Sequence, residues 1–464
     1  MRHSISAVLL ALLLAGCAVG PNYKRPPLSV PDTFRGASAD SKQSIADRKW
    51  FELFQDDVLT QLVETALRQN FDLRIATERV LEDRARFGIA RANQFPFADV
   101  NGQFNAIRNS SIGSFRFLPR GTPLDVSYTQ AGFSVSWELD LWGRLRRLTE
   151  SSRAQYLATE EARNGVIVTL LADVLTGYLT LREQDQELDI ARKTRDIAAD
   201  NLRLIELRHR RGAATGLDVS QAEQFLYTAT SQIANIERAL GQTIDSLSFL
   251  LGNAPADIPR GKTFSQFTMP PQLPAGLPSS LLMRRPDIRQ AEQVLIAANA
   301  QIGAARAQLF PQISLTGFLG GQSRALTDIV TGPGRYWIIT PSLLLPIFHA
   351  GQIRSGIQLS EAQQREMVAT YQKTIYNALR EVADALIAYD RTREQRSQQE
   401  LLVGALAESD RLSKLRYRGG IDSYLQVLDA ERNLFQGQLA LSQLQLQEFL
   451  SVVQLYRALG GGWQ

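Results

Sequence analysis

The sequence is poor in the residue types that bind metals, form disulfides or react as nucleophiles. It has one cysteine and three histidines in 464 residues, too few for the usual zinc site or a disulfide framework. It also lacks a nucleophile elbow, a metal-binding cluster and a phosphate-binding glycine loop. His209 and His349 lie far apart in the chain and do not predict a catalytic pair. These absences argue against a periplasmic enzyme.

Charge of one sign is not in excess either. The formal net charge is +4, so a polyanionic partner such as a nucleic acid is not indicated. Of four methionines, three lie beyond the N-terminal segment, at positions 269, 283 and 367. With no free thiol beside them, they give little support to a relay for soft metal ions.

Long apolar runs are rare, and the clearest one is N-terminal. The run 7-AVLLALLLA-15 is too short to span a bilayer and has the form of a secretory signal. It ends in Leu14-Ala15-Gly16-Cys17, the pattern of a bacterial lipobox, in which Cys17 is lipidated and becomes the mature N-terminus. The alternative is an ordinary signal peptide with an incidental cysteine. Position 18 is alanine, not the aspartate that marks inner-membrane retention, so we expect the protein at the outer membrane.

The second half of the chain copies the first. The stretch 207-LRHRRGAATGLDVSQAEQ-224 returns as 415-LRYRGGIDSYLQVLDAER-432, and 88-GIARANQFP-96 returns as 303-GAARAQLFP-311. The offset is about 210 residues, too long for a solenoid repeat. We interpret the chain as a duplicated large unit whose two copies share one layout.

Each copy contains a pair of segments with alternating apolar and polar residues. They are 100-VNGQFNA-106, 131-AGFSVSWELD-140, 313-ISLTGFL-319 and, less cleanly, 336-YWIITPSLLLP-346. Beyond the signal we find no apolar run of about 18 residues, so a chain that crosses a bilayer has to do so as a closed β-barrel. The alternative for these segments is a soluble hairpin with one buried face. Four strands cannot close a useful barrel, which predicts an oligomer; three protomers would supply twelve strands.

A very long helical run follows each strand pair. From Leu145 to about Arg208 the sequence has no proline and only two glycines. Apolar residues step by three and four along both runs, which predicts one narrow stripe for side-by-side helix packing. The stripes are Val166, Leu170, Val174, Tyr178 and Leu181 in the first copy, and Tyr371, Ile375, Ala378, Val382, Leu386 and Tyr389 in the second.

Each long run is predicted to turn around at the repeated motif. Gly212 is a helix C-terminal glycine. Thr215 to Asp218 then has the capping-box form with aspartate at the third position, and Ser423 to Gln426 has the standard form. A return helix of about 35 residues completes each αα-hairpin, with its turn at the opposite end of the copy from the strands.

These patterns divide the chain into five parts. They are a signal peptide (1–16), a lipidated extended segment (17–55), a first repeat (56–251), a connector rich in proline and glycine (252–283) and a second repeat (284–464). Within the repeats we expect strand pairs at about 98–140 and 311–346, helical hairpins at about 145–251 and 351–459, and tips at 209–216 and 417–424.

The chain resembles the outer membrane factors, the TolC-like exit ducts of tripartite efflux pumps, and most closely their OprM-type lipoprotein branch. The residues that carry the resemblance are 14-LAGCAVGPNYKRP-26, 276-GLPSSLLMRRPDIRQAE-292, the repeated AR-x-x-x-FP segments, 343-LLLPIFHAGQI-353 and 416-RYRGGIDSYLQVLDAER-432. The resemblance implies a mainly helical protomer with membrane β-strands. It also implies a homotrimer with one twelve-stranded β-barrel, a twelve-helix periplasmic α-barrel and an equatorial α/β collar.

The resemblance also assigns a periplasmic gate to the second hairpin. Leu425 and Asp429 match the residues of the constricting rings, and Tyr417 matches a tyrosine of the network that keeps the entrance shut; Arg416 beside it is included in the gate. Three copies of Asp429 would crowd one axis, where like charges repel or recruit a cation. The alternative is that Asp429 pairs with Arg432 on a solvated helix.

The tips are candidate contacts for an adaptor protein. Gly212, Thr215, Gly420 and Ser423 occupy them, although glycines and caps are also needed for the turns themselves. The tips are basic through Arg208, Arg210, Arg211, Arg416 and Arg418. Three roles are open for these arginines: to steer an adaptor, to hold the gate through ion pairs, or only to face solvent at the end of the hairpins.

The function implied is passive conduction of drugs or other small molecules out of the cell. The partners implied are a periplasmic adaptor (membrane fusion) protein, an inner-membrane transporter of the RND class and the lipid of the outer membrane. No cofactor is expected beyond an N-acyl diacylglycerol lipid on Cys17. The competing hypothesis is a lipid-anchored periplasmic coiled-coil protein without a pore, which leaves the four alternating segments unexplained. The transported substrate cannot be read from this sequence.

Overall fold

The computed structural model describes residues 18–28, 31–36, 44–110, 112, 123–267 and 274–462. They fall into two compact units. The strand unit comprises Met1–Pro27, Val80–Ala158 and Ala291–Tyr371, and the hairpin unit comprises Leu28–Arg79, Thr159–Gln290 and Gln372–Gln464. Each unit takes residues from both copies, so the duplicated halves are interwoven and do not fold as two consecutive domains.

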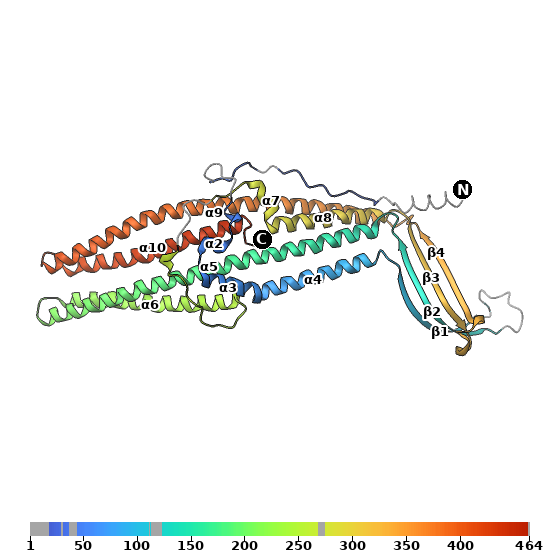
Figure 1. Cartoon of the computed structure of the whole chain (residues 1–464), viewed down its shortest axis with the longest axis horizontal. Coiled ribbons are helices and arrows are strands. Elements are labelled where there is room, and N and C mark those ends of the chain that lie inside the picture. The colour runs from blue at the N-terminus through green and yellow to red at the C-terminus, as the bar shows by residue number, and fades with distance from the viewer. Residues whose placement is uncertain are drawn as a thin grey trace. The chain divides into compact units, whose positions relative to one another are not determined.

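The strand unit contains one antiparallel sheet in the order β1-β2-β3-β4 (Figure 1). Its strands are β1 (Phe97–Arg108), β2 (Asp125–Leu139), β3 (Gln312–Ser323) and β4 (Arg335–Leu344). The first copy supplies β1 and β2 and the second supplies β3 and β4. Pro341 lies within β4, an edge strand, where a missing backbone N–H is tolerated.

A row of large apolar side chains crosses all four strands of this sheet. The register pairs Val100 with Phe133, Phe133 with Leu319, and Leu319 with Trp337. These side chains are 74%, 61%, 65% and 68% exposed, in that order along the row. No residue of β1, all of which is described, is buried on either face. The alternative of a soluble hairpin with one buried face is therefore wrong.

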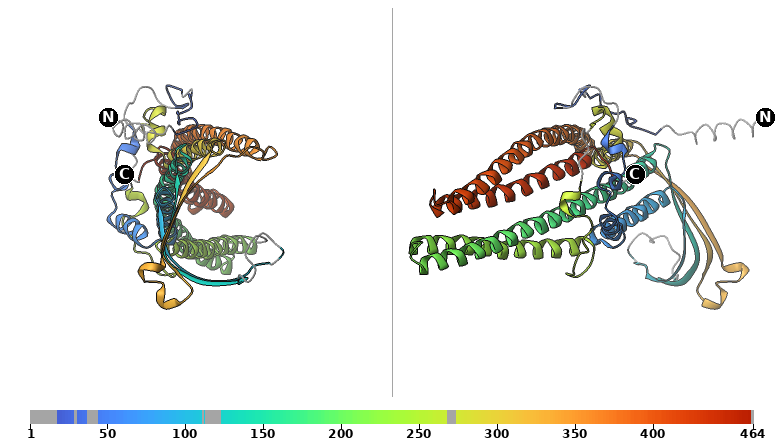
Figure 2. Two further views of the ribbon diagram at one scale, coloured as in Figure 1. Left: turned by 90° about the vertical axis from the view of Figure 1, so that its right-hand side faces the viewer. Right: turned by 60° about the vertical axis from the view of Figure 1, so that its left-hand side comes forward.

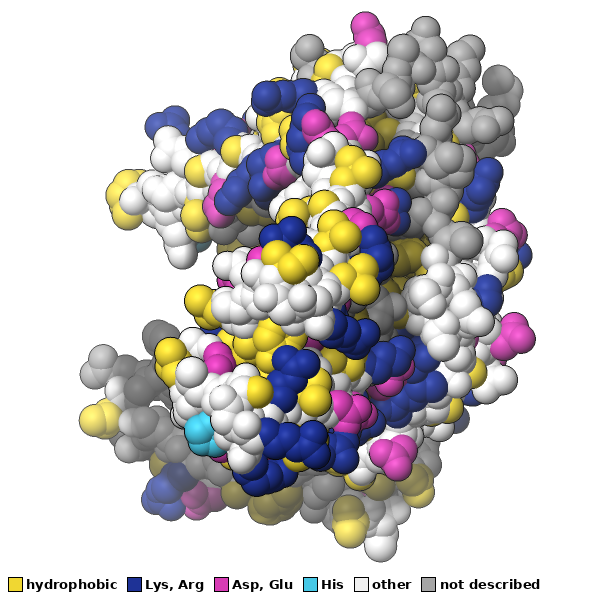
Figure 3. Space-filling model, turned by 90° about the vertical axis from the view of Figure 1, so that its left-hand side faces the viewer, with side chains coloured by type: hydrophobic (Ala, Val, Ile, Leu, Met, Phe, Trp, Pro, Cys, Tyr) yellow, Lys and Arg dark blue, Asp and Glu magenta, His cyan; other side chains and the backbone are white. Residues whose placement is uncertain are grey.

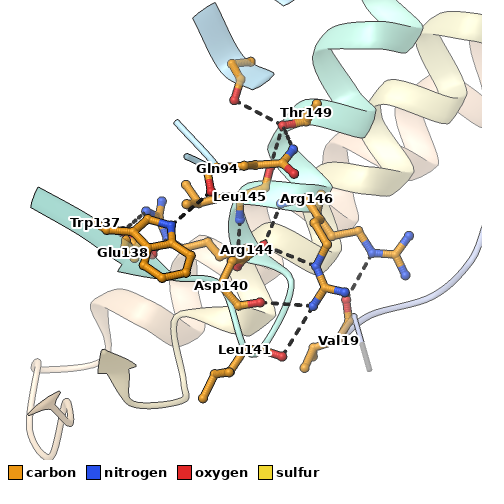
Figure 4. Close-up of polar contacts among 12 residues, drawn as sticks. Val19, Gln94, Trp137, Glu138, Asp140, Leu141, Arg144, Leu145, Arg146 and Thr149 are labelled. Atoms are coloured by element: carbon orange, nitrogen blue, oxygen red, sulfur yellow. Dashed lines mark hydrogen bonds and ion pairs between the residues drawn. The ribbon is translucent and has the colours of Figure 1, made fainter. Parts of the chain in front are cut away.

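The turn from β2 into the following helix is held by side chains on both sides of it (Figure 4). The Arg144 guanidinium donates to both carboxylate oxygens of Glu138, at 3.0 and 2.7 Å. Asp140 accepts from the backbone N–H groups of Leu145 and Arg146, at 3.0 and 2.8 Å. Asp140 thus caps the start of the helix, where N–H groups lack partners.

Two long αα-hairpins with matched lengths begin in the strand unit and continue into the hairpin unit. They are α5 (Arg144–Arg210) with α6 (Gly216–Leu250), and α9 (Gln352–Arg418) with α10 (Tyr424–Ala458). The outgoing helices have 67 residues each and the returning helices 35 each. The two hairpins lie along one another with their turns at the same end (Figures 1 and 2). The predicted stripes are buried in both copies, except Val166, which is half-buried.

Shorter helices complete both units. They are α2 (Trp50–Phe54), α3 (Asp57–Gln69), α4 (Phe71–Ala92), α7 (Leu281–Arg284) and α8 (Pro286–Ala307), with single 3-10 turns at Ile45–Asp47, Phe264–Gln266, Pro278–Ser280, Leu326–Asp328 and Gly332–Gly334. In the hairpin unit, Asp56 caps α3 and accepts from the Tyr178 hydroxyl at 3.2 Å and from the Lys262 N–H at 2.9 Å. The connector is thereby tied to the first hairpin.

The expectation that no run of about 18 residues beyond the signal is apolar enough to cross a membrane is too strong. Within the described residues, α5 contains an 18-residue window that is long and apolar enough to cross a membrane by length and composition alone. Half of this window is buried inside the chain. Burial of this kind is typical of a packed bundle helix, so the window does not alter the interpretation of α5.

Candidate functional site: the paired hairpin tips

A continuous apolar core joins the two hairpins behind their tips. Its buried members are Leu188, Ala191, Ala198, Ile205, Ala222, Phe225, Ile233, Ile236, Tyr424, Val427, Leu428 and Phe435. They come from α5 and α6 of the first hairpin and from α10 of the second. Because both hairpins bury side chains in one core, a movement of α10 at the tip has to disrupt packing against the first hairpin.

Leu425 and Asp429 lie together on the face of α10 that points away from this core. They are four residues apart, which places them on one helix face. Both are exposed, Leu425 by 49%. Asp429 accepts a hydrogen bond from Asn433 at 3.2 Å. The Arg432 guanidinium instead donates to Gln224 at 2.9 Å, so the alternative that Asp429 pairs with Arg432 is wrong.

Tyr417 links the two hairpins near their turns. The guanidinium of Arg208, at the end of α5, lies over its ring at 4.7 Å from the centroid, a cation–π distance. The centroid of the Tyr424 ring is 5.7 Å from that of Tyr417. Tyr417 thus contacts an arginine of the first hairpin and an aromatic residue of its own hairpin. The sequence identified Arg208 only as part of a basic tip, not as this partner.

Arg416 does not reach the first hairpin. Its Nε and Nη2 atoms donate to the Asp422 carboxylate at 2.5 and 3.0 Å, across the turn of its own hairpin. This hydrogen bonding lowers the pKa of Asp422. Arg416 is exposed, so the pair contributes little to stability. Its position favours a role in shaping the turn over one in joining the hairpins.

The turns themselves use glycine in the same way but differ in their caps. Gly212 and Gly420 have φ angles of 74° and 73°, a left-handed conformation that glycine adopts readily. Thr215 and Asp218 form the predicted capping box. The capping box predicted at Ser423 is wrong: its side chain caps no described N–H, because the Gln426 N–H donates to the backbone oxygen of Ser423 at 3.2 Å.

Basic side chains gather at the turn of the first hairpin, as the end-on view of Figure 3 shows (dark blue). Arg210 and Arg211 are exposed there, as is Arg418 at the other turn. No side-chain hydrogen bond or ion pair joins these three to any part of the chain that the structure describes. The Nδ1 atom of His209 donates to the backbone oxygen of Ala214 at 2.9 Å. The three arginines are therefore available to an acidic surface.

The sequence also singles out the lipidation site and the 276–292 motif. Cys17 is outside the described residues, but the segment after it is held in the strand unit: Arg25 forms an ion pair of 2.7 Å with Glu292, which also accepts from Tyr23 at 3.0 Å. In the hairpin unit, Arg285 of the 276–292 motif is buried and bonds to Asp287, Glu381 and Ala458.

The described part of the chain contains no cluster of three or more His, Cys, Asp or Glu residues that could hold a metal ion. The tips present a solvent-exposed Leu–Asp face, a cation–π link between the hairpins, and three arginines without a side-chain partner among the described residues. Such an arrangement is suited to holding the two hairpin tips together or releasing them.

Comparisons with known proteins find similar chains over nearly the whole length of this one. A family model described as outer membrane efflux protein matches residues 62–253 and 277–461. The solvent efflux pump outer membrane protein SrpC of Pseudomonas putida is 39% identical over 470 residues, covering 100% of this chain and 99% of the relative. The cation efflux system protein CusC of Escherichia coli is 34% identical over 459 residues, covering 98% of each. The open-state MtrE outer membrane channel of Neisseria gonorrhoeae superposes with a TM-score of 0.86 at 30% identity, covering 97% of this chain and 99% of that one.

Proposed function

Because this chain belongs to the outer membrane efflux protein family, we propose that three copies of it assemble into one gated duct. The protein is the outer membrane channel of an efflux pump and extends into the periplasm. It is a conduit and not an enzyme. The proposal concerns how many chains build the channel, where it closes and what it contacts.

The observation that carries the trimer is the open sheet with its apolar row. A sheet that faces lipid has to pair every edge strand, because unpaired N–H and C=O groups cost several kcal/mol each in a bilayer. Among the described strands, β1 and β4 are edges, and the row from Val100 to Trp337 is exposed. Joining β4 of one copy to β1 of the next closes both edges, and three copies give twelve strands around a lumen wider than side chains fill.

The same threefold arrangement would place four long helices per protomer around one axis, giving a twelve-helix α-barrel. The shorter helices and the connector would build an equatorial α/β collar. Three Leu425 and three Asp429 side chains would then face each other at the periplasmic end. Like charges brought together without water are unfavourable unless a cation joins them. This ring, with Tyr417 and Arg416 behind it, is the proposed gate.

The partners proposed are a periplasmic adaptor and an inner-membrane transporter of the RND class, which supplies the energy. Gly212, Thr215, Gly420 and Ser423 mark the turns where an adaptor would dock, and the unpaired arginines there favour an acidic partner surface. Lipidation of Cys17 would anchor the chain in the outer membrane. SrpC is named for solvents and CusC for cations, so a duct of this form does not itself select one substrate class; small molecules delivered by the transporter are proposed here.

The test is single-channel conductance of the purified protein in a planar bilayer, wild type beside Asp429→Ala. We expect a small conductance in the wild type and a larger one in the variant, with trimers retained in both. Loss of trimers in the variant would make Asp429 a structural residue. No conductance from either, with the protein folded, would favour the lipid-anchored coiled coil.

A further inference from the structure

A buried charged cluster lies below the tips and joins three helices. The Lys414 ammonium, on α9, is 2.9 Å from Glu431 of α10 and 2.8 Å from Asp410 of its own helix. Asn201, on α5 of the first hairpin, donates to Glu431 at 2.7 Å. Glu431 therefore bonds to both hairpins at once, and it is the only residue of the cluster that does so among the described contacts.

Glu431 is removed from water, whereas the side chains of Lys414 and Asp410 are partly exposed. Glu431 is 5% exposed, and burial raises its pKa, although Lys414 opposes that effect. Burial also lowers the pKa of Lys414, but its hydrogen bonds to Asp410 and Glu431 outweigh this effect and the net shift is upward. Removing one member of a buried ion pair leaves the other charged group unpaired at a high cost. The cluster is thus a strong local constraint on the position of α10.

The duplication shows that the hairpin does not require this cluster. In the first copy the positions of Lys414, Glu431 and Asp410 are held by Glu206, Glu223 and Leu202. Two glutamates cannot form an ion pair, and neither of them bonds through its side chain to any described residue. The first hairpin nevertheless has the same helix lengths as the second. The cluster therefore has a purpose beyond the turn.

Its position on α10 indicates that purpose. Glu431 follows Asp429 by two residues, or about 200° around the helix. Asp429 is exposed and Glu431 faces the first hairpin. We propose that Glu431, with Lys414 and Asn201, is an internal latch that holds α10 against α5 and thereby keeps Leu425 and Asp429 in the closed position. This inference rests on the proposed gate.

The first test measures the latch without using conductance. Cys17 is the only native cysteine, so Val427→Cys adds one reporter thiol in the core between the hairpins, where Val427 is 3% exposed. Its rate of maleimide modification is compared in trimers with Glu431→Gln, Asn201→Ala or neither. We expect each change to raise the rate about tenfold, a discounted value for a partly exposed pair.

The matched control is Glu448→Gln. Glu448 is also buried on α10 and pairs with Arg396 at 2.8 Å, but Arg396 belongs to α9, so this pair lies within one hairpin. Glu448→Gln should leave the rate of maleimide modification unchanged. An unchanged rate in Asn201→Ala, or an equal rise in Glu448→Gln, overturns the latch. The same holds if Glu431→Gln fails to form trimers while Asn201→Ala behaves as the wild type.

The second test joins the latch to the gate. Glu431→Gln should raise channel open probability about tenfold, while Glu448→Gln should not. If Asp429→Ala raises conductance but Glu431→Gln does not, the latch does not act on the gate and the inference is wrong. If modification rises in Glu431→Gln while Asp429→Ala has no effect on conductance, α10 is held by the latch and the proposed gate is the part that fails.

Discussion

The two hairpins share one design and differ in how their sides and tips are charged. Each has an outgoing helix of 67 residues, a glycine in left-handed conformation and a return helix of 35. The first carries Gln221 where the second carries Asp429, and Glu206 where the second carries Lys414. Helix lengths and turn glycines are the same in both copies, while Asp429 and Lys414 occur only in the second.

This difference distinguishes residues that both hairpins require for folding from residues proposed to act in gating. A helix length, a turn glycine and an apolar stripe are required in both hairpins because both pack in the same way. In the proposed mechanism, a charged latch and an exposed Leu–Asp face are required only in the hairpin that closes the duct. The residues that differ between copies are therefore better candidates for function than those that repeat, and each prediction below alters one copy and uses the other as its control.

The largest expected effect is a pH dependence of stability that resides in the first copy. Glu183 is 3% exposed, and burial, followed by the negative charge of Glu187, raises its pKa from 4.5 to about 8, although a hydrogen bond with Ser442 opposes the shift. Between about pH 4.5 and 8 the folded state holds a proton that the unfolded state has released, so stability falls as pH rises, by at most about 1.4 kcal/mol per pH unit. Glu183→Gln should flatten this slope in melting experiments from pH 5 to 9.

The control for Glu183 is Arg391, its counterpart in the second copy. Its side chain is 76% exposed and pairs with Glu394 at 2.6 Å. Arg391→Gln should leave the slope unchanged, because an exposed pair adds little. An equal pH slope in Glu183→Gln and wild type would mean that Glu183 is ionised in the folded protein.

The next effect concerns the exposed face of α10. Replacing both Leu425 and Asp429 by alanine should widen the resting entrance and raise single-channel conductance about tenfold, since both the apolar constriction and the charge ring are lost. The matched variant replaces Leu217 and Gln221 in the first copy and should conduct as the wild type. Equal increases in the conductance of the two double variants would mean that the constriction is not specific to the second hairpin.

Much of the architecture was predictable because it depends on local periodicity. Alternation at period two located the strands, and steps of three and four located stripes that are buried in both copies, as at Val174 and Val382. The cap at Ser423 was not predictable, because whether a side chain or a backbone oxygen takes the N–H of Gln426 depends on the turn geometry. The partner of Arg432 was not predictable either, since Gln224 lies 208 residues away.

The two caps give a smaller and more local contrast. The Thr215 side chain accepts from the Asp218 N–H at 3.2 Å, and replacing a capping residue by alanine costs about 1 kcal/mol. Thr215→Ala should therefore speed hydrogen exchange of the first-turn amides of α6 about fivefold. Ser423→Ala should leave exchange in the first turn of α10 nearly unchanged. A similar rise at both turns would contradict the difference between the caps.

The smallest effect expected is that of the link between Arg208 and Tyr417. A cation–π contact at a partly exposed site contributes about 0.5 kcal/mol, so Arg208→Ala should raise channel open probability only about twofold. Arg210→Ala removes the same charge from the same turn without removing a contact to a described side chain. If the two variants behave alike, the basic charge of the tip controls opening; if only Arg208→Ala opens the channel, the contact across the hairpins does.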